Sequence, residues 1–104
     1  MLNLDAKNHL AYARLGKIYE TFQKDYENAL FFYKKGLEIE PTYEAYIKIG
    51  DCLFEMGSIV DAYLNFKEAL SIRKTPEVYQ KIAEVHEKQG QDRKAIDAYS
   101  LALK

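Results

Sequence analysis

The chain has 104 residues, which suits one small domain, and its 48% hydrophobic and 30% charged residues match an ordinary globular protein. Two prolines and five glycines leave few breaks, which favours helices over a fold with many turns. The net charge of −1, from 15 basic and 16 acidic residues, argues against nucleic-acid binding because such proteins carry a basic excess or a basic stripe.

Cysteine content and hydropathy bound the class of protein further. A single cysteine excludes an internal disulfide framework and a multi-cysteine zinc site. No apolar run approaches the ~18 residues of a membrane span, and the first residues have neither the basic nor the apolar region of a signal peptide. We therefore expect an intracellular, cytoplasmic protein that does not enter a membrane.

The sequence repeats itself at a regular interval, which is close to the spacing of known helical repeats. A shift of 33 places residues 46–50 on residues 79–83 and Gly57 on Gly90. The first unit needs a shift of 34 that falls to 33 after its turn, so it carries one extra residue near residues 22–24. Within each unit, apolar or small residues recur at i, i+3, i+4 and i+7, which predicts two helices per unit.

In chain order, this period divides the sequence into four parts. Residues 1–8 are in phase with the ends of later helices and are expected to be the tail of a preceding repeat helix. The first repeat covers residues 9–42, the second covers residues 43–75 and the third covers residues 76–104. We expect six helices of roughly a dozen residues, no sheet, and one continuous repeat domain that is a fragment of a longer array.

Residues typical of helix starts stand where the repeat predicts that helices begin. Asp25 is placed to cap the second helix of the first repeat, and Thr42 the first helix of the second repeat. Residues 58–61 match a capping box, which predicts that the Ser58 side-chain oxygen accepts a hydrogen bond from a backbone N–H of the helix start. Thr75 precedes Pro76, a proline at the first helical position, where its missing N–H has no cost.

Small residues and rings alternate at fixed positions of every unit. The small positions hold Gly16, Gly50 and Ala83; Ala29, Ala62 and Ala95; and Gly36, Ala69 and Ala102. The ring positions hold Tyr12, Tyr46 and Tyr79, and Tyr33, Phe66 and Tyr99. Small residues packed against large ones let two antiparallel helices approach closely, which predicts that Gly50 lies at a contact between helices.

This pattern resembles the tetratricopeptide repeat family, whose units of about 34 residues carry an aromatic residue, Leu-Gly, further aromatic and alanine positions, and a final proline. The first repeat supplies Tyr12, Leu15, Gly16, Tyr19, Ala29, Tyr33, Gly36 and Pro41. The resemblance recurs three times in phase over residues 9–104. It implies an all-α fold, a right-handed α-solenoid of antiparallel helix hairpins, and binding of other proteins.

In such a solenoid the first helix of each hairpin lines the concave face, which in this family holds peptides or helices of partner proteins. The predicted peptide-binding residues are Arg14, Lys17, Ile47, Lys48, Asp51, Phe54, Lys81 and Glu84. Arg14, Lys48 and Lys81 share one repeat position and predict a basic row. Ile47 and Phe54 predict an apolar anchor. The alternative is a solvated face whose salt bridges contribute little.

No group of residues indicates catalysis. His86 occupies the position of Tyr19 and Leu53 in the other units, so packing is its expected role, and His9 is far from it in the repeat order. Cys52 is expected to be a buried structural thiol, because no histidine or basic cluster is placed to lower its pKa. We predict no enzyme, no catalytic residue, no metal site and no cofactor.

The predicted function is therefore that of a protein–protein interaction module, with a scaffold or adaptor role, which binds a peptide or helix of a partner on its concave face. One alternative is a self-associating structural scaffold, a homo-oligomer that stacks through its end repeats. Ile96, Tyr99 and Leu103 are then expected to be exposed or covered by another molecule. The other alternative is a non-catalytic targeting part of a larger enzyme.

Overall fold

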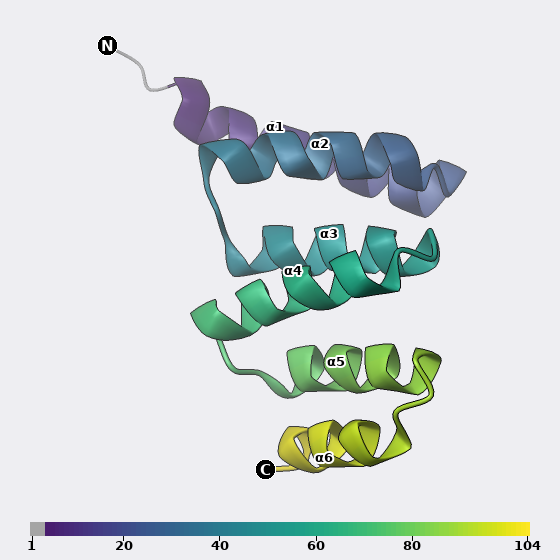
Figure 1. The fold of residues 1–104 in the computed structure, drawn as a ribbon. Helices are drawn as coiled ribbons and strands as arrows, with labels where there is room; N and C mark the ends of the chain where they lie inside the picture. Colours follow the sequence, from purple (N-terminus) through teal and green to yellow (C-terminus); the bar gives the residue numbers. More distant parts are fainter. Residues whose placement is uncertain (1–3) are drawn as a thin grey trace.

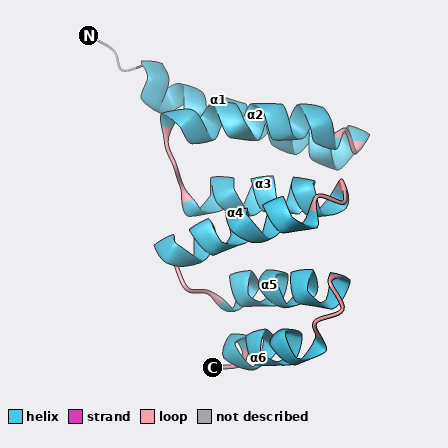
Figure 2. Cartoon of the chain, viewed as in Figure 1, coloured by secondary structure: helices cyan, strands magenta, loops and turns pink. Residues whose placement is uncertain are grey.

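A computed structural model describes the backbone of residues 4–104 and the side chains of residues 9–104. Within this part the chain forms six α-helices and no strand (Figures 1 and 2). The helices are α1 (Leu4–Ile18), α2 (Tyr26–Ile39), α3 (Tyr43–Glu55), α4 (Ile59–Ile72), α5 (Pro76–Lys88) and α6 (Asp92–Ala102), and a π-helix, η1 (Tyr19–Gln23), continues α1. The predicted all-helical fold is confirmed.

The six helices pair as three antiparallel hairpins. The closest packing joins α1 to α2, α3 to α4 and α5 to α6, and the contacts between α2 and α3 and between α4 and α5 join successive hairpins. In Figure 1 the hairpins follow one another from the N-terminal end at the top to the C-terminal end at the bottom. Extents of 51 × 27 × 19 Å describe the resulting elongated α-solenoid.

Residues 4–8 differ from the prediction. The helix α1 runs without interruption from Leu4 to Ile18, so residues 4–8 extend the first hairpin rather than form the end of a preceding helix, and residues 1–3 lie outside the described chain. The reason is local: residues 4–8 contain no proline, whereas Pro41 stands just after the end of α2 and prevents its continuation. The repeat boundaries at residues 9, 43 and 76 stay a prediction.

Three of the four predicted helix caps form. Side-chain oxygens of Asp25, Thr42 and Thr75 each accept a hydrogen bond, at 3.1–3.2 Å, from the backbone N–H three residues further on. Ser58 makes no such bond, so the predicted capping box is wrong. Ser58 and Asp25 have similar backbone angles (φ −85°, ψ 71° and φ −89°, ψ 81°), but the aspartate carboxylate reaches one bond further than the serine hydroxyl.

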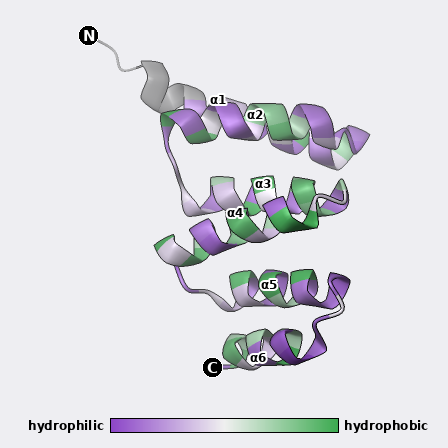
Figure 3. Cartoon of the chain, in the orientation of Figure 1, coloured by the Kyte–Doolittle hydropathy of each residue, from purple (hydrophilic) through white to green (hydrophobic). Residues whose placement is uncertain are grey.

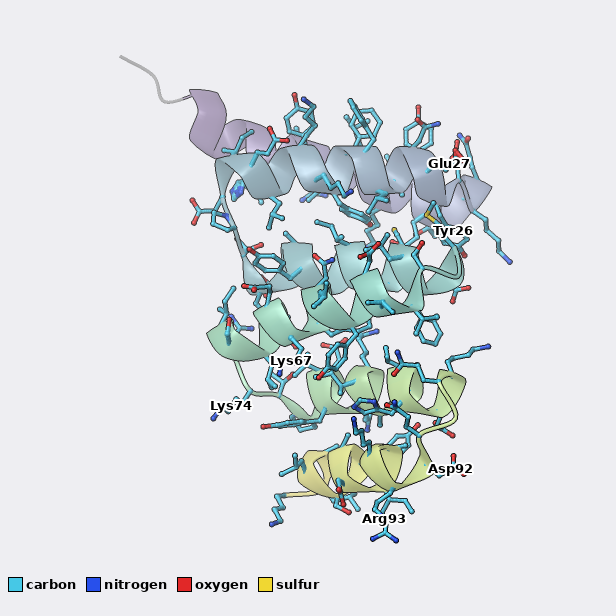
Figure 4. All side chains as sticks on the ribbon, viewed as in Figure 1. Tyr26, Glu27, Lys67, Lys74, Asp92 and Arg93 are labelled. Atoms are coloured by element: carbon cyan, nitrogen blue, oxygen red, sulfur yellow. The ribbon has the colours of Figure 1, made fainter. Side chains whose placement is uncertain are left out.

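Acidic residues in the first turn also stabilise two of the helices. Glu27 lies in the first turn of α2 and Asp92 in the first turn of α6, and both side chains lie near the right-hand ends of their helices in Figure 4. Negative charge is favourable there, because the unpaired N–H groups of a helix start carry a partial positive charge.

The extra residue of the first repeat lies in the π-helix η1. A π-helix accommodates one inserted residue without ending the helix. Lys24 follows it with φ 49°, the one non-glycine residue of the described chain with a positive φ. The corresponding turns of the other two hairpins use Gly57 (φ 86°) and Gly90 (φ 74°). The predicted irregularity of the first turn is thus confirmed, and it places a lysine where glycine is preferred.

Lys24→Gly is expected to stabilise the chain by about 1 kcal/mol, because left-handed backbone angles strain a residue that has a Cβ and do not strain glycine. Urea denaturation measures the change. The matched controls are Gly57→Ala and Gly90→Ala, whose added methyl groups would meet no atom within 4 Å. They should therefore lose stability through backbone strain alone. A Lys24→Gly chain less stable than the parent would contradict this account.

The core lies between the two helices of each hairpin and between successive hairpins. In Figure 3 hydrophobic and hydrophilic segments alternate along each helix, as expected for amphipathic helices. A Cβ atom added to Gly16 would lie 2.7 Å from the Tyr33 ring, and one added to Gly50 would lie 2.5 Å from the Phe66 ring. Both rings therefore rest directly on helix backbone, which confirms the predicted small-against-large packing.

Candidate protein-binding surface

A cavity of about 450 Å³ lies between the first and second hairpins, lined by α1, α2, α3 and the turn before α3. We call it the α1–α3 groove. Its lining includes Leu10, Ala13, Arg14, Lys17, Ala45 and Lys48. The first four come from α1 and the last two from α3, so the groove joins the inner helices of two repeats.

The α1–α3 groove combines positive charge with an apolar surface. Arg14, Lys17 and Lys48 line it, and none of the three forms a salt bridge with a described residue. Of its carboxylates, Glu44 pairs with Arg73 at 3.5 Å. Such a groove can attract a negatively charged segment over a distance of about 10 Å at 0.1 M salt and can cover an apolar side chain.

The structure corrects the prediction for Ile47. Its side chain is 5% exposed and belongs to the hydrophobic core, so it cannot anchor a ligand. Ile47 and Lys48 are neighbours on α3, and successive residues of a helix point about 100° apart. Because Lys48 lines the α1–α3 groove, Ile47 turns towards the packed interior of the stack.

Lys81 does not extend a free basic row, because it pairs with Asp51. Lys81 Nζ lies 2.8 Å from Asp51 Oδ1, and the two side chains are only 22% and 25% exposed. Burial opposes the charge of Lys81, but the hydrogen bond and the charge of Asp51 raise its pKa above the ordinary value. Burial also raises the pKa of Asp51, and Lys81 offsets that rise only in part. The pair therefore links α3 to α5 with no net charge.

Phe54 and Glu84 lie apart from the α1–α3 groove. They line a shallow hollow of about 340 Å³ together with Glu87 and Lys88, which we call the Phe54 hollow. Phe54 is half-buried and packs against the core cluster. Apart from Ile47, which lies in the core, the predicted site residues thus fall into three places: the groove, the neutral pair and the hollow.

Sequence reasoning missed the part of the groove that does not come from first helices. Gly36 and Glu40 lie at the end of α2 and Thr42 in the turn that follows, and all three line the cavity. The prediction assigned the inner face to the first helix of each hairpin alone. Glu40 and Thr42 stood out only as the end of one helix and the cap of the next, so nothing marked them as a surface.

Cys52 is buried and His86 packs against a neighbouring ring, as predicted. Cys52 is fully buried, and burial, followed by the Glu20 and Asp51 carboxylates, raises its pKa to about 12. His86 packs against Tyr63 with ring centroids 5.5 Å apart. In the chain from residue 9 onward, no group of three or more histidine, cysteine, aspartate or glutamate side chains could hold a metal ion. None of the helices seen here is long and apolar enough to cross a lipid bilayer.

The outward face of α6 is apolar. Ile96, Tyr99 and Leu103 are all exposed, as the repeat phase predicts. Self-association through this face stays a prediction.

Comparisons with known proteins agree with the fold. The family model named tetratricopeptide repeat matches residues 9–43 and 76–104, more than half of the chain. No curated protein sequence matches.

Among solved structures, the crystal structure of MamA has a TM-score of 0.87 at 25% sequence identity, and the match covers 98% of this chain and 60% of the MamA chain. Two further structures show the shared fold alone. The Arabidopsis OM64 TPR domain has a TM-score of 0.90 at 16% identity, with 95% of this chain and 83% of that chain covered. The N-terminal domain of stress-induced protein-1 from C. elegans has a TM-score of 0.86 at 21% identity, with 98% and 87% covered. With three stacked hairpins and a family model that matches more than half of its residues, the chain belongs to the tetratricopeptide repeat family, whose fold points to a scaffold for protein–protein interaction.

Proposed function

We propose that this chain binds an acidic segment of a partner protein in the α1–α3 groove, as a scaffold or adaptor with no catalysis of its own. The observation that supports the proposal is the combination of three lining cations, Arg14, Lys17 and Lys48, with a cavity of about 450 Å³. None of the three has a salt-bridge partner among the described residues, so their charge is available to a ligand.

Charge and apolar contact are expected to contribute differently to the free energy of binding. An exposed ion pair contributes only ~0–1 kcal/mol and is screened by salt. Burial of one leucine-sized side chain contributes about 1.5–3 kcal/mol, and Leu10, Ala13 and Ala45 offer the apolar surface for it. The matching ligand is therefore a segment with several aspartate or glutamate residues around one bulky apolar side chain.

Lys48→Glu is expected to weaken binding of such a ligand about tenfold at about 50 mM salt, mainly by slowing association. The probe is a fluorescein-labelled ten-residue peptide with four acidic residues around a central leucine. Fluorescence anisotropy gives Kd, and stopped-flow mixing gives the two rates. The dependence of Kd on salt should become flatter, because one attractive charge has become repulsive.

The matched control is Lys67→Glu. Lys67 is an exposed residue of α4, lies 5.7 Å from the Tyr63 ring and does not line the groove (Figure 4). It carries the same change of charge and should bind the peptide like the parent. Leu10→Ala should instead speed dissociation, since it removes apolar contact without changing charge. Equal binding by the Lys48→Glu and Lys67→Glu chains would place recognition elsewhere.

A further inference from the structure

Two positions of the hairpin change together along the stack. One is on the inner face of the first helix and its continuation, and the other is the ring position of the second helix. They hold Glu20 and Tyr33 in the first hairpin, Phe54 and Phe66 in the second, and Glu87 and Tyr99 in the third. A glutamate therefore accompanies each tyrosine, and a phenylalanine accompanies the phenylalanine.

The structure shows the physical link between these positions. The Tyr33 hydroxyl donates a hydrogen bond to Glu20 Oε1 at 2.8 Å, and the Tyr99 hydroxyl donates one to Glu87 Oε1. Phe66 has no hydroxyl and needs no hydrogen-bond acceptor. The inner position of the middle hairpin therefore does not have to hold a glutamate. Phe54 occupies it and presents apolar surface in the row where the neighbouring repeats carry carboxylates.

The surroundings of Phe54 are acidic on the side of α5. Glu84 and Glu87 line the Phe54 hollow, with Lys88 as its one lining cation. An aromatic ring beside two carboxylates suits a guanidinium or ammonium group, because the ring face attracts a cation and the carboxylates neutralise it. The chain itself uses this chemistry: Lys81 Nζ lies 6.0 Å from the Phe66 ring centroid, and the Arg73 guanidinium lies 4.7 Å from that of Tyr43.

The inner surface therefore has two regions of opposite charge. The α1–α3 groove is cationic, the Phe54 hollow is anionic, and the neutral Lys81–Asp51 pair links α3 and α5 beside them. Lys48 and Phe54 are six residues apart on α3, which is ~9 Å along the helix axis, and their side chains point ~120° apart around it. The path between the two side-chain ends is therefore longer than the axial rise, and an extended peptide covers it in about four residues.

We propose that the Phe54 hollow is a second subsite, which takes an arginine or lysine side chain located about four residues from the acidic segment of the same partner. This proposal rests on the proposed function of the α1–α3 groove and adds the charge order of the ligand to it. The partner segment is bipolar: acidic residues around one apolar residue at one end, and one basic residue at the other.

The test uses the whole chain and three labelled peptides, each made in both sequence directions. The acidic peptide carries the acidic residues and leucine followed by glycine and serine. The bipolar peptide adds one arginine four residues beyond the acidic end. The basic peptide keeps the arginine and has serine in place of every acidic residue. At about 0.1 M salt the bipolar peptide in one direction is expected to bind at least fivefold more tightly than the acidic peptide.

Variants of the chain show whether the Phe54 hollow causes the gain in affinity for the bipolar peptide. Phe54→Ala and Glu84→Gln should each abolish the gain and leave the affinity for the acidic peptide unchanged, whereas Lys48→Glu should weaken both peptides. Glu84 is exposed, so its variant stays informative if Phe54→Ala fails to fold. The matched control is Glu27→Gln, which removes an exposed carboxylate of α2 outside the hollow.

The outcomes separate the two proposals. Equal affinity of the bipolar and acidic peptides in both directions overturns the second subsite and leaves the groove standing. An equal loss of the gain in Glu84→Gln and Glu27→Gln also overturns it, since the arginine then responds only to overall charge. If the acidic peptide fails to bind but the basic peptide shifts the backbone NMR signals of Phe54 and Glu84, the groove proposal fails and the subsite is supported.

Discussion

Gly50→Leu is expected to destabilise the chain by about 1–3 kcal/mol through overpacking. A Cβ atom at this position would already lie 2.5 Å from the Phe66 ring, and a leucine adds three more carbon atoms. The ring is 2% exposed, so it can move aside only if α3 and α4 separate. Urea or thermal denaturation measures the loss, and the melting temperature should fall by about 4–8 °C per kcal/mol.

Two further variants show whether the contact with Phe66 causes this loss. Gly36→Ala is the milder control, because its Cβ would lie 3.2 Å from the His9 carbonyl oxygen and 3.5 Å from Tyr12 Cβ. Phe66→Leu combined with Gly50→Ala should recover part of the stability that Gly50→Ala loses alone. A Gly50→Leu chain that melts like the parent would show that this glycine is not at the helix–helix contact.

Cys52 is expected to react with a disulfide reagent at pH 8 about a thousandfold more slowly in the folded chain than in urea. Burial raises its pKa from 9.0 to about 12, and the Glu20 and Asp51 carboxylates add to the rise. The reactive thiolate is therefore about a thousandfold rarer, and full burial blocks the reagent further. The release of the coloured thiol measures the rate, and similar rates for folded and unfolded chains would contradict the assigned burial.

The same shift makes stability depend on pH in a defined direction. The unfolded chain releases the Cys52 proton near pH 9, whereas the folded chain keeps it to about pH 12. The unfolded state therefore binds fewer protons between these values, and stability falls as pH rises from 9 towards 12. Below pH 9 this contribution is complete. Cys52→Ala should lessen the slope of stability against pH in this window, and part of the slope should remain because burial also raises the pKa of Tyr33.

The candidate site was predictable only in part. The repeat register placed Arg14 and Lys48 on the same inner row, and both line the α1–α3 groove. Lys81 shares that register but pairs with Asp51 from the neighbouring hairpin. The register specifies which side of a helix a residue occupies, and it contains no information on which charge in another repeat lies within bonding distance.

By itself, the sequence determined the type, number and pairing of the helices, because their signals are local or periodic. Pro41, Thr75 and the small residue Gly50 each act on their own helix or hairpin, and the regular spacing of the repeats brings such residues back in every unit. Only the tertiary structure decided which equivalent residues are buried. Leu15 is 40% exposed and Ile49, at the same repeat position, 1%, because a side chain is covered by the hairpins on either side of its own. That neighbourhood depends on the place of a repeat in the stack, which a pattern shared by all repeats does not encode.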